Sequence, residues 1–186
     1  MTEKLKCISF PTNVRSPRII REYLKVLIKY NFPKYDPDFE KEFIIALSRE
    51  GAYGGNLDKL NETSKRTQGR VRYGYLKSFG FAYEDEGRNI IITPAGRAFA
   101  DDSRDPHSVW LDQMVKWQIP NPHLDVRSGY GDFAIHPFIT VLNILTKVGR
   151  LSKEEIGLFI LTMKKNQDVP NTIARIRNYR DLENSE

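Results

Sequence analysis

The stretch "SKRTQGRVRYGYLKSFGFAYEDEGRNIIITPAG", which runs from Ser64 to Gly96, decides the fold of this chain. Its first fourteen residues hold five cations and no acid. Two β-prone runs, "FAYE" and "NIIIT", then flank the turn "DEGR". This order predicts a basic helix over 67–79, ended by Gly80, and a β-hairpin over 81–93.

A helical projection separates the basic segment into two faces. At about 100° per residue, three cations and one aromatic ring fall on a narrow stripe, and apolar residues fall opposite. The stripe consists of Arg66, Arg70, Tyr73 and Lys77. The apolar side consists of Val71, Tyr75, Leu76 and Phe79. We therefore expect this helix to bury one face and to present the stripe to solvent.

Two helices are predicted upstream of the basic helix. The first starts in "RSPRIIREYLKVLIKYNF", where Ser16 can cap and Pro17 suits the first helical position. The second repeats this pattern in "DPDFEKEFIIALSREG" with Asp36 and Pro37. Three helices, the third of them basic, followed by a hairpin are typical of a winged helix, whose third helix enters the DNA major groove. The predicted fold class is mainly α with a small β-hairpin.

Helical patterns continue after the hairpin. Short helices are expected at "PAGRAFADD", capped by Thr93, and at "DPHSVWLDQMVKWQ", where Trp110 and Trp117 are expected to pack in the core. Further helices are predicted at "HPFITVLNILTKVG", "LSKEEIGLFILTMKKN" and "NTIARIRNYRDLE". The second of these carries a capping box at Ser152 and Glu155.

The helical patterns are interrupted once, by a stretch rich in Pro and Gly over 119–135. We predict an inter-lobe loop there. It separates a winged-helix DNA-recognition lobe with an N-terminal arm, over 1–118, from a second lobe resembling a helix-turn-helix, over 136–186.

The basic stripe points to double-stranded DNA as the partner. A solvated basic face usually interleaves acids with its cations at a spacing of four residues, and no acid occurs within 64–77. Arginine contacts guanine and glutamine contacts adenine through two hydrogen bonds, so base-edge contacts are predicted for Gln68, Arg70 and Tyr73. Backbone or phosphate contacts are predicted for Arg15, Arg18, Lys65, Arg66, Arg72, Lys77, Arg88 and Arg127. Weaker candidates, each followed by nearby acids, are Arg175, Arg177 and Arg180.

The sequence offers no pattern of an active site. Neither a G-x-S-x-G motif nor a phosphate-binding G-x-x-x-x-G-K-[ST] loop occurs. None of the lysines has an acid two residues before it, so the D/E-x-K pair of a common metal-dependent nuclease core is missing. The three histidines and the single Cys7 have no zinc spacing. We expect no catalytic residue, metal or cofactor in this chain, no membrane association, and a cytoplasmic location.

Several segments resemble the N-terminal part of the AlwI-type restriction and nicking endonucleases. They are "RSPRIIREYLKVL", "ITPAGRAFA", "WLDQMVKWQ" and "KVGRLSKEEI", and the similarity extends from about Arg15 to Asn166. The resemblance implies a type IIS enzyme in which winged-helix subdomains read a short asymmetric DNA site as a monomer. It also implies a separate C-terminal nuclease domain, or a separate subunit, of the PD-(D/E)xK type that cuts with magnesium.

The expected function is therefore DNA recognition for such an enzyme, without the cleavage domain. Three alternatives stay open on the sequence. A winged-helix transcriptional regulator would dimerise on a palindromic site. A basic protein-interaction module would bind DNA weakly and without sequence preference. A complete enzyme would need an active site of an unfamiliar kind.

Overall fold

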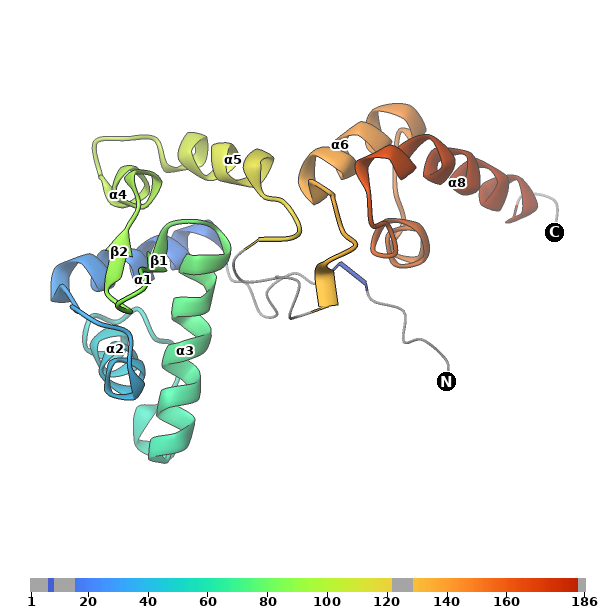
Figure 1. The fold of residues 1–186 in the computed structure, drawn as a ribbon. Helices are drawn as coiled ribbons and strands as arrows, with labels where there is room; N and C mark the ends of the chain where they lie inside the picture. The colour runs from blue at the N-terminus through green and yellow to red at the C-terminus, as the bar shows by residue number, and fades with distance from the viewer. Residues whose placement is uncertain (1–6, 9–15, 122–128, 184–186) are drawn as a thin grey trace. The chain divides into compact units, whose positions relative to one another are not determined.

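The computed structural model describes residues 7–8, 16–121 and 129–183 of the 186-residue chain (Figure 1). Contacts divide the chain into two compact units: a first unit, Asn13–Gln113, and a second unit, Met114–Glu186 with Met1–Thr12. Ile8 is buried, and its N–H donates a 2.7 Å hydrogen bond to the carbonyl of Leu161. The sequence places Ile8 in an arm of the first lobe, whereas the structure pairs it with the second unit.

The first unit is helical with one small sheet. Its elements are α1 (Pro17–Tyr30), α2 (Pro37–Arg49), the 3-10 helix η1 (Leu57–Lys59), α3 (Glu62–Ser78), β1 (Ala82–Glu84), β2 (Ile90–Ile92), α4 (Pro94–Ala100) and α5 (Pro106–Lys116). The last turn of α5 is counted with the second unit. The prediction of a mainly helical chain with a small antiparallel hairpin is confirmed.

Side-chain caps start several of these helices. Asp36 accepts the Phe39 N–H at 2.7 Å before α2, and Thr93 accepts the Gly96 N–H at 2.9 Å before α4. Asn61 accepts the Ser64 N–H at 2.8 Å, so α3 begins at Glu62, five residues before the predicted start. A satisfied N-cap stabilises a helix by about 1 kcal/mol, which favours this earlier start.

Aromatic packing holds the helices of the first unit together. The rings of Phe81 and Phe99 stack with centroids 4.5 Å apart. Trp110 of α5 packs against both rings and lies 4.8 Å from the ring centroid of Phe79. Trp110 therefore packs against the core as expected, although it is only half-buried itself. This cluster joins the end of α3, the start of the hairpin, α4 and α5.

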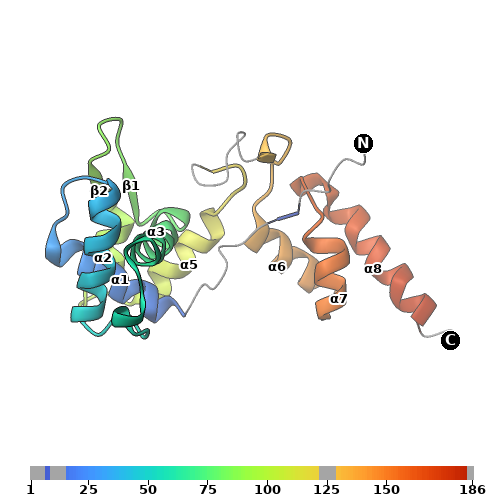
Figure 2. The ribbon, with the colours of Figure 1, turned by 90° about the horizontal axis from the view of Figure 1, so that it is seen from below.

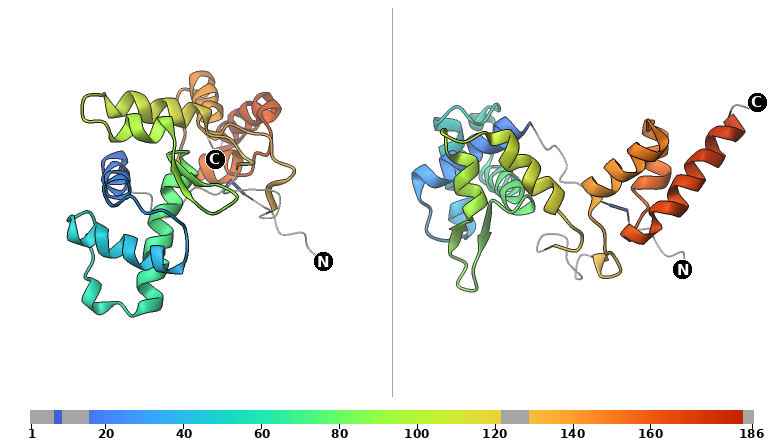
Figure 3. Two further views of the ribbon diagram at one scale, coloured as in Figure 1. Left: turned by 60° about the vertical axis from the view of Figure 1, so that its left-hand side comes forward. Right: turned by 90° about the horizontal axis from the view of Figure 1, so that it is seen from above.

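The hairpin pairs with the loop between α1 and α2 as well as with itself. Within it, Ala82 lies opposite Ile92 and Glu84 lies opposite Ile90. Beyond it, Ile90 donates its N–H to the Pro33 carbonyl at 3.2 Å, and the Arg88 carbonyl accepts the Tyr35 N–H at 2.8 Å. These bonds fix the hairpin turn, which extends past the helices of its unit (Figures 2 and 3).

The second unit is built on two neighbouring helices, α6 (Pro137–Val148) and α8 (Val169–Glu183) (Figure 1). Between them in sequence lie α7 (Lys153–Glu155), the π-helical turn η3 (Ile156–Ile160) and the 3-10 helix η4 (Asn166–Asp168). The predicted capping box is present: the Ser152 side chain accepts the Glu155 N–H at 3.1 Å, and the Glu155 side chain accepts the Ser152 N–H at 2.7 Å.

Two further expectations concern this part of the chain. Trp117 is 6% exposed, and its ring meets that of Phe138 edge to face at 5.8 Å, which confirms its core position. The boundary was predicted within 119–135, whereas contacts divide the two units between Gln113 and Met114, and residues 122–128 of the predicted loop lie outside the described residues. Across the described segments, none of the helices combines the length and the apolar character of a membrane span.

Candidate nucleic-acid interface

A glycine sets the position of the basic helix α3. A Cβ added to Gly69 would lie 1.7 Å from the carbonyl oxygen of Glu40, so α3 approaches α2 backbone to backbone at this point. A contact this close admits only glycine. The inner face of α3 is therefore the one that carries Gly69, together with Tyr73 and Leu76, both fully buried.

The close approach corrects one predicted site residue. Tyr73 was expected on the exposed stripe as a base contact, but its side chain is 0% exposed. Val71, expected on the apolar side, is 38% exposed. Tyr73 therefore cannot reach a DNA base in this structure, and that prediction is wrong. The helical projection placed Tyr73 on the wrong face because it did not consider Gly69. The missing side chain of Gly69 is what allows α3 to pack closely against α2.

Two arginines of α3 face solvent. Arg70 is exposed and has no hydrogen-bond or ion-pair partner among the described residues. The Arg66 side chain is 47% exposed, and its Nε lies 3.8 Å from a carboxylate oxygen of Glu40. The Nη groups of both guanidinium groups remain able to bind an acceptor from outside. These two residues form the outer cationic face of α3.

The remaining cations and the glutamine of α3 contact other groups within the protein. Arg72 donates to the Gln68 side-chain oxygen at 2.6 Å, and its guanidinium carbon lies 4.8 Å from the ring centroid of Tyr53. Gln68 is thus engaged in the helix and half-buried. Lys65 pairs with Glu62 at 3.1 Å. The predicted DNA contacts of Lys65, Gln68 and Arg72 stay predictions, and each must compete with these internal partners.

Lys77 joins α3 to the hairpin. Its Nζ lies 3.0 Å from one carboxylate oxygen of Glu84 on β1 and donates a 3.2 Å hydrogen bond to the other. The same ammonium group lies 5.3 Å from the ring centroid of Tyr35 and 5.6 Å from that of Tyr73. A cation held by a carboxylate and two aromatic faces stabilises the junction of the helix and the hairpin.

Tyr35 is the centre of a cluster that the sequence did not reveal. Its hydroxyl donates a 2.7 Å hydrogen bond to Glu40, and its ring stacks on Tyr73 at 5.3 Å. The guanidinium carbon of Arg88, in the hairpin turn, lies 5.0 Å from the centroid of the Tyr35 ring. Arg88 is exposed, with a backbone φ of 63°. One tyrosine therefore contacts both the carboxylate beside Arg66 and the cation of the turn.

The electrostatics of the cluster keep both phenols neutral. Burial raises the pKa of Tyr35, the hydrogen bond to Glu40 raises it further, and the nearby charge of Arg70 acts in the opposite direction. Burial also raises the pKa of Tyr73, with the negative charge of Glu84 adding to the effect. Tyr35 therefore keeps its proton at neutral pH, and its hydroxyl donates to Glu40.

Three predicted backbone contacts lie elsewhere. Arg18 is exposed in the first turn of α1. Arg15 and Arg127 lie outside the described residues. Their predicted contacts with DNA therefore stay predictions.

The arginines of α8 anchor that helix within the second unit. Arg180 donates to the buried Glu155 at 2.5 Å and also to the carbonyls of Val148 and Arg150. This ion pair lowers the pKa of the Glu155 carboxyl. The guanidinium, the carboxylate and the two carbonyls are thereby all hydrogen-bonded within the second unit. Arg180 thus connects α8 to the end of α6.

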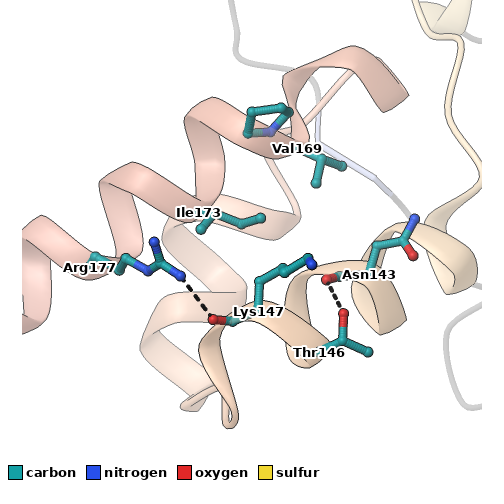
Figure 4. A pocket seen from close by; sticks show the side chains of 7 residues that line it. Asn143, Thr146, Lys147, Val169, Ile173 and Arg177 are labelled. Atoms are coloured by element: carbon teal, nitrogen blue, oxygen red, sulfur yellow. Dashed lines mark hydrogen bonds between the residues drawn. The ribbon is translucent and has the colours of Figure 1, made fainter.

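Arg177 lies beside a shallow groove between α6 and α8. It donates a 3.1 Å hydrogen bond to the Lys147 carbonyl at the end of α6 (Figure 4). The groove has a volume of about 440 Å³, with an apolar side formed by Val169 and Ile173. Arg175 lies 5.1 Å from the ring centroid of Phe159. Arg175 and Arg177 are exposed, but each of the three arginines of α8 has a contact within the second unit.

The structure also bears on metal binding. Within the described residues, no three side chains of His, Cys, Asp or Glu gather into a group that could hold a metal ion. The expectation that this chain holds no metal or cofactor stays a prediction.

An exposed arginine face on a helix, beside a β-hairpin whose turn also carries an arginine, is typical of proteins that bind nucleic acids. The chain belongs to the AlwI restriction endonuclease family, since the sequence model of that family matches residues 77–186, more than half of the chain. Membership in a restriction endonuclease family implies interaction with DNA. A comparison with curated proteins gave no match.

Proposed function

We propose that this chain recognises a specific sequence in double-stranded DNA for a restriction endonuclease. The observation that carries the proposal is a set of three exposed arginines, of which one lies over the ring of Tyr35 and one lies beside its hydrogen-bond partner Glu40. The guanidinium carbon of Arg88 lies 5.0 Å from the ring centroid of Tyr35, the Nε of Arg66 lies 3.8 Å from Glu40, and Arg70 is exposed four residues further along α3. The three arginines come from two elements, the helix α3 and the hairpin turn.

The arrangement suits the two kinds of contact that DNA recognition needs. An arginine on the outer face of a helix contacts O6 and N7 of guanine in the major groove through two hydrogen bonds. An arginine in an exposed turn contacts the phosphate backbone and fixes the orientation of the protein. We assign the first role to Arg70, the second to Arg88, and a phosphate contact to Arg66. In this proposal the first unit acts as a winged helix, with α3 as the recognition helix.

The family supports a more detailed proposal. The parent enzyme is of type IIS, and it reads a short asymmetric site as a monomer. Cleavage is carried out by a separate PD-(D/E)xK nuclease domain or subunit that uses magnesium. The missing D/E-x-K pair supports this division of labour. It predicts that the purified chain does not cut plasmid DNA in the presence of magnesium, and reproducible metal-dependent cutting by pure protein would overturn it.

Selection of bound duplexes from a random library tests the proposed recognition. The selection is run at about 150 mM salt, where non-specific phosphate contacts are weakened. One enriched, asymmetric word of a few base pairs is the expected result. A palindromic word would instead indicate a dimeric regulator. No enrichment would leave a sequence-blind basic surface and would overturn the proposal.

A further inference from the structure

Tyr35 and Glu40 connect the two elements of the proposed interface. The hydroxyl of Tyr35 donates to one Glu40 oxygen at 2.7 Å, and the Arg66 Nε lies 3.8 Å from the other. On the hairpin side, the guanidinium carbon of Arg88 lies over the Tyr35 ring, 5.0 Å from its centroid. Tyr35 and Glu40 thus link Arg66 of α3 to Arg88 of the hairpin turn.

The surroundings of this pair hold it rigidly. Glu40 is only 7% exposed, so it cannot turn toward solvent to satisfy its charge. The backbone N–H of Tyr35 is bonded to the Arg88 carbonyl at 2.8 Å, and its ring stacks on the fully buried Tyr73. The Glu40 carboxylate, which faces Arg66, and the Tyr35 ring, which faces Arg88, therefore have fixed positions.

The pair leaves guanidinium N–H groups of both arginines available to donate to DNA. The Arg66 Nε lies 3.8 Å from the Glu40 carboxylate, and the Arg66 side chain is still 47% exposed. The guanidinium carbon of Arg88 lies over the Tyr35 ring, and a guanidinium placed over a ring can still donate through the N–H groups at its edge. Fixing a side chain before binding reduces the entropy that association must remove.

We propose that Tyr35 and Glu40 are a positioning pair, which holds Arg66 of α3 and Arg88 of the hairpin turn in the orientation in which they contact DNA. The inference rests on the proposed function, since it needs a DNA ligand. Neither residue contacts the DNA itself. The pair acts through the two arginines, so its effect on binding depends on their presence.

A double-mutant cycle tests the link to Arg66. Tyr35→Phe removes only the hydroxyl and keeps both ring contacts. We expect it to raise the Kd for the selected duplex by about three- to tenfold. In an Arg66→Ala background the same change should have less than about a twofold effect, because the positioned group is gone. In an Arg70→Ala background, which leaves the pair intact, the full effect should return.

Controls separate positioning from stability. Tyr83→Phe on the exposed face of β1 is the matched control and should leave Kd unchanged. Glu40→Gln, which keeps the shape of the side chain, should show the same dependence on Arg66 as Tyr35→Phe. Binding is measured well below the unfolding midpoint of every variant. The slope of log Kd against log salt should not change in Tyr35→Phe, since the number of phosphate contacts stays the same.

A second cycle tests the link to Arg88. Tyr35→Leu removes the ring as well as the hydroxyl, so it should weaken binding more than Tyr35→Phe, and Arg88→Ala should abolish the additional loss. An equal loss in every background would show a structural role only and would overturn the inference while the proposed function stands. If the unaltered protein selects no DNA word, both fall together.

Discussion

Two helices of this chain carry arginines at close spacing, and the structure uses them in opposite ways. On α8, Arg180 bonds to a buried carboxylate and two carbonyls, and Arg177 bonds to the end of α6. On α3, Arg70 has no such partner among the described residues, and Arg66 remains half-exposed. A run of cations in a sequence therefore does not by itself predict a nucleic-acid contact, because the fold can engage a cation internally, as it does Arg72 of α3 and Arg180 of α8.

The position of α3 can be disturbed most strongly at Gly69. Gly69→Ala should destabilise the first unit by at least about 3 kcal/mol, because its Cβ would meet the Glu40 carbonyl. Gly74→Ala on the same helix is the matched control. Nothing lies within 4 Å of its added Cβ, so it should stabilise the unit by about 0.5–1 kcal/mol. Urea unfolding followed by circular dichroism measures both, and equal effects would contradict the proposed close contact.

The internal role of the α8 arginines is tested at Arg180. Arg180→Ala leaves the buried Glu155 without its cation and frees two carbonyls, so we expect a loss of about 2–3 kcal/mol in the free energy of unfolding. Arg175→Ala, which removes only a contact with a ring, should have a much smaller effect. Both variants should bind the selected duplex with unchanged affinity once folded. Loss of DNA affinity without loss of stability would reverse the comparison.

The external role of the α3 arginines is tested at Arg70. Arg70→Ala should weaken binding to the selected duplex by about 1–3 kcal/mol and relax preference at one base pair. Thermal unfolding of the free protein should not change, because Arg70 has no partner among the described residues to lose. Fluorescence anisotropy with a set of single-base variants of the duplex measures this. An equal loss on all sequences would instead indicate a phosphate contact.

The smallest predicted effect concerns pH. Arg180 holds the pKa of Glu155 below its ordinary value near 4.5, so the stability from this pair is fully present above that value and is lost as pH falls through the lowered pKa. Glu155→Gln should therefore flatten the acid side of the stability curve of the second unit. Glu154→Gln, at the exposed neighbouring position, serves as the control. If the unaltered protein, Glu155→Gln and Glu154→Gln all lost stability with falling pH in the same way, the Arg180–Glu155 pair would not be the cause of the acid-side loss.

Local chemistry explains what could be predicted from the sequence. The caps at Asp36, Thr93 and Ser152 bond to amides three residues away, so they can be read without knowing the fold. The hairpin was equally readable, since two β-prone runs flank a turn. Ser16 precedes a helix as predicted, although its side chain makes no capping hydrogen bond.

The errors arose where partners are distant in sequence. Tyr73 was misplaced because the inner face of α3 is chosen by a contact between Gly69 and Glu40, on different helices. The cluster around Tyr35 was missed for the same reason, since it draws on a loop, two helices and the hairpin. The predicted phosphate contact of Lys77 stays a prediction, but its pairing with Glu84, with which DNA would have to compete, could only be seen once the hairpin was placed beside α3.

One comparison of charge-matched variants tests the central claim most directly. The double variant Arg66→Ala/Arg70→Ala removes two positive charges from α3. The double variant Arg175→Ala/Arg177→Ala removes two from α8, so both change the net charge of the protein equally. The account predicts that the α3 pair abolishes selective binding to the selected duplex and lowers the salt slope, whereas the α8 pair leaves both nearly unchanged. Equal losses for the two variants, or a larger loss for the α8 pair, would contradict it.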